Sequence, residues 1–132
     1  MNKPKTAEAF APAAISSFFE IHDTEANKPI TNLEEVGARG GGFGLQKGVW
    51  TKVTIEEAKR SGITVIINGK NAPEAETTRT VIEKLLNKLR KSYSVIVNHK
   101  IEVPIGTGFG TSAGGALTSA LALKEALDLP LT

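Results

Sequence analysis

The stretch PIGTGFGTSAGGAL, from Pro104 to Leu117, constrains the fold of this chain more than any other part of the sequence. Five of its residues are glycines, and it lies between a β-branched run and a segment rich in alanine and leucine. This order predicts a strand, a glycine-rich loop and a helix. The first amides of a helix have no acceptor within the helix, and the helix dipole places partial positive charge there, so such a junction can bind an anion.

The positions of the individual residues suit that role. Thr111 and Ser112 add hydroxyl groups where the helix is expected to begin. Gly114 and Gly115 fall in its first turns, where each glycine costs about 1 kcal/mol relative to alanine, so we expect a ligand or a neighbouring backbone to approach closely. Three glycines of the loop can adopt positive φ and have no Cβ to keep an anion away, namely Gly106, Gly108 and Gly110.

The spacing of these residues argues against two common phosphate-binding motifs. A Walker loop needs G-x-x-x-x-G-K-[ST], and no lysine precedes Thr111 or Ser112. A dinucleotide fingerprint needs G-x-G-x-x-G near the first strand, whereas the spacing here is G-x-G-x-G and lies late in the chain. A glycine-rich turn that binds no ligand stays open as the alternative.

The first half of the chain predicts strands separated by a loop. Residues 14–22, AISSFFEIH, alternate apolar Ile15, Phe19 and Ile21 with other positions and predict a strand. Residues 27–44 carry turn residues and five glycines, and predict a loop whose backbone approaches something closely. Residues 42–55 predict a second strand with its apolar odd-numbered residues on one face and Trp50 on the other.

The second half predicts two strands and two helices. Residues 63–69 read as a strand that ends at an Asn-Gly turn, and residues 74–91 have the apolar spacing of a helix. Residues 94–103 alternate again and place His99 on the apolar face, where a packed histidine with one hydrogen-bonded nitrogen is favoured over a substrate contact. The last helix is expected from Thr111 to about Asp128, with Leu117, Leu121 and Leu127 directed toward a core.

Composition narrows the class of protein. The 132 residues suit a single domain, and 40% hydrophobic with 23% charged residues are near globular averages. The absence of cysteine excludes disulfides and thiolate chemistry, and the net charge of +2 is spread along the chain, so we expect no nucleic-acid partner. No apolar run approaches the roughly 20 residues that span a bilayer, so we expect a cytoplasmic protein with no membrane partner.

Three stretches together resemble a known superfamily. PIGTGFGTSAG resembles the central signature of the GHMP kinases, roughly P-x-x-x-G-L/F-G-S/T-S-A, and FAPAAISSFFEIHD lies where that superfamily carries its first signature. GARGGGFGLQKGVWTKV resembles its archaeal pantoate kinase branch, so the resemblance extends over most of the chain. One departure is Ala13 and Ala14, where several members have Gly-Lys, so a basic phosphate contact is not expected there.

The resemblance implies a fold and a set of site residues. The implied fold is α+β: a mixed sheet with helices on one face and a left-handed βαβ unit, similar to the second domain of a small-subunit ribosomal protein. Ser112 would lie near Mg²⁺. The residues implied for substrate contact are Ser16, Ser17, His22 and Arg39, the last as a partner for a carboxylate. Those implied to wrap the phosphates of ATP are Gly106, Thr107, Gly108, Phe109, Gly110, Thr111 and Ser112.

The implied activity is phosphoryl transfer from ATP to the primary hydroxyl of pantoate, for coenzyme A synthesis. Members of the superfamily are about twice as long, and their acidic metal ligand and proposed base lie downstream of the glycine loop. Residues 1–132 therefore resemble an N-terminal, ATP-binding domain that lacks the C-terminal domain, and we expect no kinase activity from them alone. A missing domain or second polypeptide would be a partner, and exposed sheet and helix surfaces predict a homo-oligomer.

Two other functions stay open. The chain could belong to a GHMP kinase with another small alcohol as acceptor, such as homoserine or mevalonate. It could also be a non-catalytic binding module of the same fold, including one that binds nucleic acid. Titration with Mg-ATP and with a random oligonucleotide separates these classes.

Overall fold

A five-stranded mixed sheet forms the body of the molecule in the computed structural model, which describes residues 3–130. The strand order is β1-β4-β7-β5-β6, and only β5 and β7 pair in parallel. A short β2-β3 hairpin forms a separate sheet. The strands are β1 (Lys5–His22), β2 (Thr24–Glu25), β3 (Lys28–Pro29), β4 (Gly37–Glu57), β5 (Gly62–Ile67), β6 (Lys70–Asn71) and β7 (Tyr93–Ile101).

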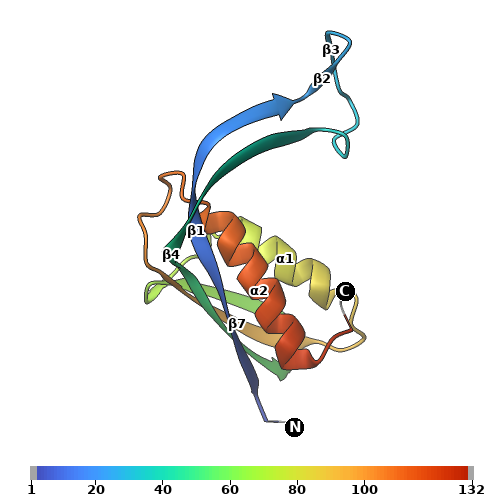
Figure 1. Ribbon diagram of the computed structural model, residues 1–132. Coiled ribbons are helices and arrows are strands. Elements are labelled where there is room, and N and C mark those ends of the chain that lie inside the picture. Colours follow the sequence, from blue (N-terminus) through green and yellow to red (C-terminus); the bar gives the residue numbers. More distant parts are fainter. Residues whose placement is uncertain (1–2, 131–132) are drawn as a thin grey trace.

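The two helices, α1 (Glu76–Leu86) and α2 (Thr111–Leu127), lie side by side on one face of this sheet (Figure 1). α2 packs against β1 and β4, and α1 packs against α2 and β5. α1 lies in the chain between the parallel strands β5 and β7, so the expected βαβ unit is present. The α+β class, the mixed sheet and the helices on one face are confirmed, and the left hand of the βαβ unit stays a prediction.

The hydrophobic core lies between the sheet and the two helices. Alternate residues of β4 and β7 point into it because successive side chains of a strand point to opposite faces. α2 contributes Ala122 and Leu123, and α1 contributes Ile82 and Leu86. The buried strand residues of this core are Val53, Ile55, Val65, Val95 and Val97.

The paired strands β1 and β4 continue past the helices as a curved two-stranded ribbon (Figure 1). We call this part the arm, made of residues 14–22 of β1, 37–44 of β4 and the segment between them. No helix covers the arm, and its large apolar side chains are exposed: Ile15, Phe18, Phe19, Ile21, Leu33, Val36 and Phe43. The sequence predicts a strand over 14–22, but the apolar face expected from its alternation is not buried.

The prediction of a loop over residues 27–44 is wrong for its glycine-rich part. Residues 37–44 are the first part of β4 and pair with β1. A Cβ at Gly42 would lie 2.2 Å from the Ile15 carbonyl oxygen, and one at Gly40 would lie 2.3 Å from that of Phe18. The backbone that these glycines approach closely is therefore the neighbouring strand, at a place where the pairing register shifts.

The predicted helices need two corrections. α1 ends at Leu86, and a series of turns replaces the last turn expected over residues 74–91. Leu117 and Leu121 are about half exposed and do not face the core, whereas Leu127 packs against it. The buried face of α2 instead carries small and polar residues, which let the helix approach β1 and β4 closely: Gly115, Thr118, Ser119 and Ala122, with Leu123 as its large residue.

The Asn-Gly turn after β5 is confirmed. Asn68 and Gly69 both have positive φ, 49° and 81°, as a tight two-residue turn requires. The side chain of Asn68 also donates to the Ile101 carbonyl and accepts from the Ile101 amide, which fixes the end of β7. The glycine loop leaves the sheet from this point.

Candidate functional site

The glycine loop between β7 and α2 has the backbone conformation that the sequence predicts. Gly106, Gly108 and Gly110 have φ values of 75°, 87° and 72°. A Cβ at any of the three would meet nothing within 4 Å, so these residues are glycines because of their φ and not because of crowding. The open space beside the loop is available to a ligand.

One hydrogen bond stabilises the loop itself and another joins it to β1. Thr107 donates its hydroxyl to the Pro104 carbonyl, 2.9 Å away, so this hydroxyl has a role within the loop. The Phe109 carbonyl accepts a hydrogen bond from the Ala14 amide at 3.2 Å. This bond joins the loop to β1 at the base of the arm. The glycine loop and the first signature are therefore neighbours in space.

The first amide groups of α2 have no protein acceptor among the residues that the structure describes. Gly110, in the left-handed conformation, precedes the helix, and no side chain caps it. Within residues 3–130 the first amide to bond back to the loop is that of Gly114, which donates to the Gly110 carbonyl at 2.9 Å. The amides of residues 111–113 and the exposed Ser112 hydroxyl thus stand where a helix dipole favours negative charge.

A cavity of about 380 Å³ opens beside this helix end. Thr111 and Ser112 line it from α2, and Glu76 and Thr78 line it from the beginning of α1. Ile67, Ile101 and Ile105 give it an apolar wall. A cavity with such a wall can hold an apolar group next to the beginning of α2, whereas Glu74 and Glu76 in its lining disfavour an anion unless a cation lies between.

The candidate substrate residues separate into two groups. Ser16 and Arg39 line a common shallow hollow on the arm, of about 430 Å³, which also includes Ala14 and so adjoins the glycine loop. Ser17 lies at the register shift between Ser16 and Phe18 and does not line the hollow. His22 is eight residues beyond Ala14, roughly 26 Å along an extended strand, so the arm does not bring it to the loop.

A buried polar cluster beneath the cavity is a feature that sequence reasoning did not find. His99 is 4% exposed, and both of its ring nitrogens have partners: the Thr51 hydroxyl lies 2.7 Å from Nδ1 and the Thr78 hydroxyl 3.1 Å from Nε2. The Thr51 hydroxyl also lies 2.5 Å from that of Thr118 in α2. Burial lowers the pKa of His99 to about 4, so the ring is neutral at pH 7.

The prediction that His99 packs in the core is confirmed, although both of its ring nitrogens are hydrogen-bonded instead of one. The signal for the cluster was Thr51, which interrupts the apolar face of the β4 sequence. Gly115 is explained by the same cluster, because a Cβ there would lie 3.3 Å from Cε1 of His99. Gly114 similarly faces Val49, so side chains, and not a ligand or backbone, approach these two glycines.

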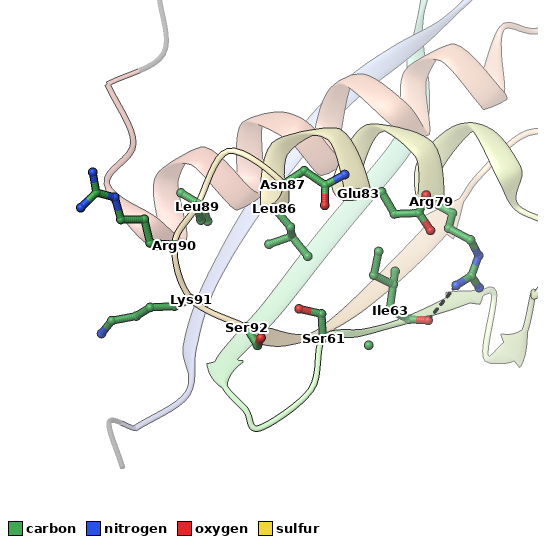
Figure 2. Close-up of a pocket in the computed structure, with 11 residues that line it drawn as sticks. Ser61, Ile63, Arg79, Glu83, Leu86, Asn87, Leu89, Arg90, Lys91 and Ser92 are labelled. Carbon is green, nitrogen blue, oxygen red and sulfur yellow. Dashed lines mark hydrogen bonds between the residues drawn. The ribbon is translucent and has the colours of Figure 1, made fainter.

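A larger cavity, of about 540 Å³, lies at the other end of α1 (Figure 2). Arg79 is bound there to the Ile63 carbonyl at 3.0 Å, and Glu83 lies beside it. Figure 2 shows Arg90 and Lys91 directed away from the space between the helix and β5. None of the predicted site residues lines this cavity, so its size does not make it the site.

The cavity that Ser112 lines also contains two carboxylates that could contribute to a magnesium site. Mg²⁺ takes oxygen ligands and is usually held by one or two carboxylates together with substrate phosphates. The Ser112 hydroxyl is exposed, and Glu74 and Glu76 line the same cavity. The chain from residue 3 to residue 130 contains no group of three or more acidic, histidine or cysteine side chains that could hold a metal ion.

Comparison with known proteins agrees with these features. No family model matches the chain. It is 39% identical over 123 residues to the pantoate kinase of Thermococcus kodakarensis, an alignment that covers 89% of this chain and 38% of that kinase. The chain is a homologue of pantoate kinase. Its resemblance to the GHMP kinases is thereby confirmed.

Several solved structures share this fold. A phosphotransferase related to the CoA biosynthesis pathway is 37% identical, with a TM-score of 0.78 over 92% of this chain and 40% of its own. Two others share the fold at lower identity: mevalonate diphosphate decarboxylase from Staphylococcus aureus (22%, TM-score 0.64, 98% and 38% covered) and homoserine kinase from Cytophaga hutchinsonii (18%, TM-score 0.61, 97% and 37% covered). The chain thus spans about two fifths of the length of the relatives it matches.

No helix within residues 3–130 is long and apolar enough to cross a membrane.

Proposed function

We propose that this chain supplies the ATP phosphate-binding part of a kinase that phosphorylates the primary hydroxyl of pantoate. The observation that carries the proposal is the loop of three positive-φ glycines that leads into the uncapped beginning of α2, in a chain 39% identical to a pantoate kinase. In phosphoryl transfer the protein chiefly positions the reactants and stabilises spread negative charge. Amides at a helix terminus and a magnesium ion beside Ser112 suit that task.

The hollow on the arm supports a place for the acceptor. It adjoins the glycine loop at Ala14, whereas Arg39 lies toward its far end, opposite Glu20, which is six residues or roughly 20 Å along an extended strand from Ala14. The planar group of Arg39 can bind a carboxylate through two parallel hydrogen bonds. Ser16 lies in the same hollow. We propose Arg39 and Ser16 as contacts for pantoate, and we propose that a further segment or a second polypeptide completes the catalytic groups.

The binding half of the proposal is tested by titrating the purified chain with Mg-ATP, with phosphate and with a random oligonucleotide. We expect binding of Mg-ATP and weak binding of phosphate, because the exposed amides belong to a helix packed within residues 3–130. A chain that binds the oligonucleotide and not Mg-ATP would be a binding module of another kind.

The catalytic half is tested in a fusion of this chain to the part of the Thermococcus kinase that the alignment does not cover. We expect the fusion to phosphorylate pantoate, and Ser112→Ala to lower its kcat by at least about tenfold, since the hydroxyl serves the charge on the metal and phosphates. Arg39→Ala should raise KM for pantoate far more than KM for ATP. A fusion that prefers homoserine or mevalonate would favour another acceptor.

A further inference from the structure

We infer that a chain of hydrogen bonds through His99 positions the beginning of α2, so that His99, Thr51 and Thr118 set the affinity for the triphosphate without touching it. The inference rests on the proposed function, because it assigns a role to residues beneath the phosphate-binding amides. Its basis is the direction of four hydrogen bonds that connect α1, β7, β4 and α2.

The direction follows from counting hydrogens, starting at α2. The Thr118 hydroxyl has one hydrogen and two helix carbonyls within reach, that of Gly114 at 2.8 Å and that of Gly115 at 3.2 Å, so a hydrogen donated to either leaves none for Thr51. Its 2.5 Å contact with the Thr51 hydroxyl therefore makes Thr51 the donor. Thr51 then has no hydrogen left for His99, so Nδ1 of His99 donates to Thr51 over 2.7 Å.

The other side of the imidazole completes the chain. With its proton on Nδ1, neutral His99 has Nε2 free to accept, and the Thr78 hydroxyl donates to it at 3.1 Å. Every hydroxyl hydrogen is then used once, from Thr78 through His99 and Thr51 to Thr118 and Gly114. The reverse direction would take the Thr118 hydrogen away from the Gly114 carbonyl and lose a hydrogen bond.

The chain of bonds ends where position matters for ligand binding. Gly114 is in the first turn of α2, immediately after the amides of residues 111–113, which have no acceptor within residues 3–130. The first turn of a helix is its least constrained part because its amides lack partners within the helix. An attachment of that turn to the sheet holds those amides in place before a ligand arrives, which reduces the entropy that binding costs.

Burial makes this attachment stiff. Thr51, Thr118 and His99 are all less than 5% exposed, and within residues 3–130 no buried side-chain polar atom lacks a hydrogen-bond partner. Hydrogen bonds in such surroundings are stronger than in water, and a broken one leaves an unpaired polar group. α2 therefore cannot rotate or slide on the sheet without a penalty.

The test compares hydroxyl deletions that keep side-chain shape. Thr118→Val and Thr51→Val each break the chain, and Ser119→Ala is the matched control, because the buried Ser119 hydroxyl bonds only within α2, to the Gly115 carbonyl at 2.6 Å. Binding of Mg-ATP and of inorganic triphosphate with Mg²⁺ is measured by calorimetry. Amide hydrogen exchange of residues 113–115 is measured in the free chain.

We expect both valine variants to weaken binding of the two probes by about two- to thirtyfold, the range for residues that couple to a site from outside it. They should also speed exchange at the beginning of α2. Ser119→Ala should leave binding unchanged whatever it does to stability. Thr118→Ser keeps the hydroxyl and should restore wild-type affinity if Thr118→Val folds poorly.

Replacing His99 tests which side of its ring carries the effect. Asn places an amide near the Nδ1 position, where it can bond Thr51, and Gln places one near the Nε2 position, where it can bond Thr78, so His99→Asn should keep affinity and His99→Gln should lower it. If the loss of affinity is proportional to the loss of stability in all variants, Ser119→Ala included, the inference is overturned. A wild-type chain that binds neither probe would overturn the proposed function and this inference together, whereas wild-type binding with unchanged variants would overturn this inference alone.

Discussion

At the scale of single residues, φ separates glycines that serve the loop from those that serve packing. Gly108 has φ of 87° and open space around its Cα, so the expected cost of a side chain there is a backbone cost of about 1–2 kcal/mol. We predict that Gly108→Ala lowers the free energy of unfolding by about that amount and weakens phosphate binding. Gly62→Ala is the control, because Gly62 has equal space without positive φ. Urea unfolding and phosphate titration measure both, and equal effects of the two variants would contradict the prediction.

His99 predicts a pH dependence of stability. Its pKa is about 4 in the fold against 6.5 in an unfolded chain, so between these values the unfolded state binds a proton that the folded state does not. The contribution of neutral His99 to the free energy of unfolding is therefore fully present above about pH 6.5. It falls as pH decreases toward 4, by about 3 kcal/mol at most. Urea unfolding at several pH values should show this slope, which His99→Gln should reduce and His22→Asn, at an exposed position, should keep. A slope that survives His99→Gln would assign it to other groups.

At the scale of elements, the arm depends on glycines that let two strands approach across shifted registers. A Cβ at Gly42 would lie 2.2 Å from the Ile15 carbonyl oxygen, whereas one at Gly44 would meet nothing within 4 Å. We predict that Gly42→Ala separates the strands and costs about 1–3 kcal/mol, and that Gly44→Ala costs little. Hydrogen exchange should rise for residues 14–22 in Gly42→Ala while the core amides stay protected. Equal exchange in both variants would show that the arm tolerates the wider spacing.

The elements also show what the sequence could predict. Alternation correctly gave the buried face of β7 and that of β4 from Val49 onward, because helices cover one side of these strands there, but it also placed Phe43 on that face, and Phe43 is exposed in the arm. The same alternation failed in β1, since a period of two cannot tell whether anything covers the face that carries Phe19. Leu117 and Leu121 were misplaced because small residues, and not leucines, let α2 lie close to the sheet.

The candidate site also has one part that could be predicted from the sequence and one part that could not. The loop glycines and the beginning of α2 were predictable, because positive φ and helix starts have local signatures. The cluster around His99 joins residues from 51 to 118, and no local pattern encodes which distant hydroxyls meet. Arg39 and Ser16 share a hollow because the two strands of the arm pair, which required the register to be known.

At the scale of the whole molecule, the arm is the part least stabilised by packing against other elements. It is a two-stranded ribbon without a covering layer, and such ribbons are marginally stable in water. Phe18, Phe19 and Phe43 are 66–70% exposed, which concentrates apolar surface on a thin projection. Contiguous apolar surface of this kind marks a region that another surface covers.

We therefore predict that the purified chain self-associates through the arm. Sedimentation velocity over a range of concentrations should show a mass that rises above the 14.0 kDa of one chain. Phe19→Ser together with Phe43→Ser should shift the association to higher concentration, because it removes apolar area from the arm alone. Leu117→Ser is the matched control, since Leu117 is 56% exposed on α2, outside the arm. If Leu117→Ser dissociates the chain as strongly as the double variant, the helix layer and not the arm forms the contact, and a chain that is monomeric at all concentrations would show that the arm is stable uncovered.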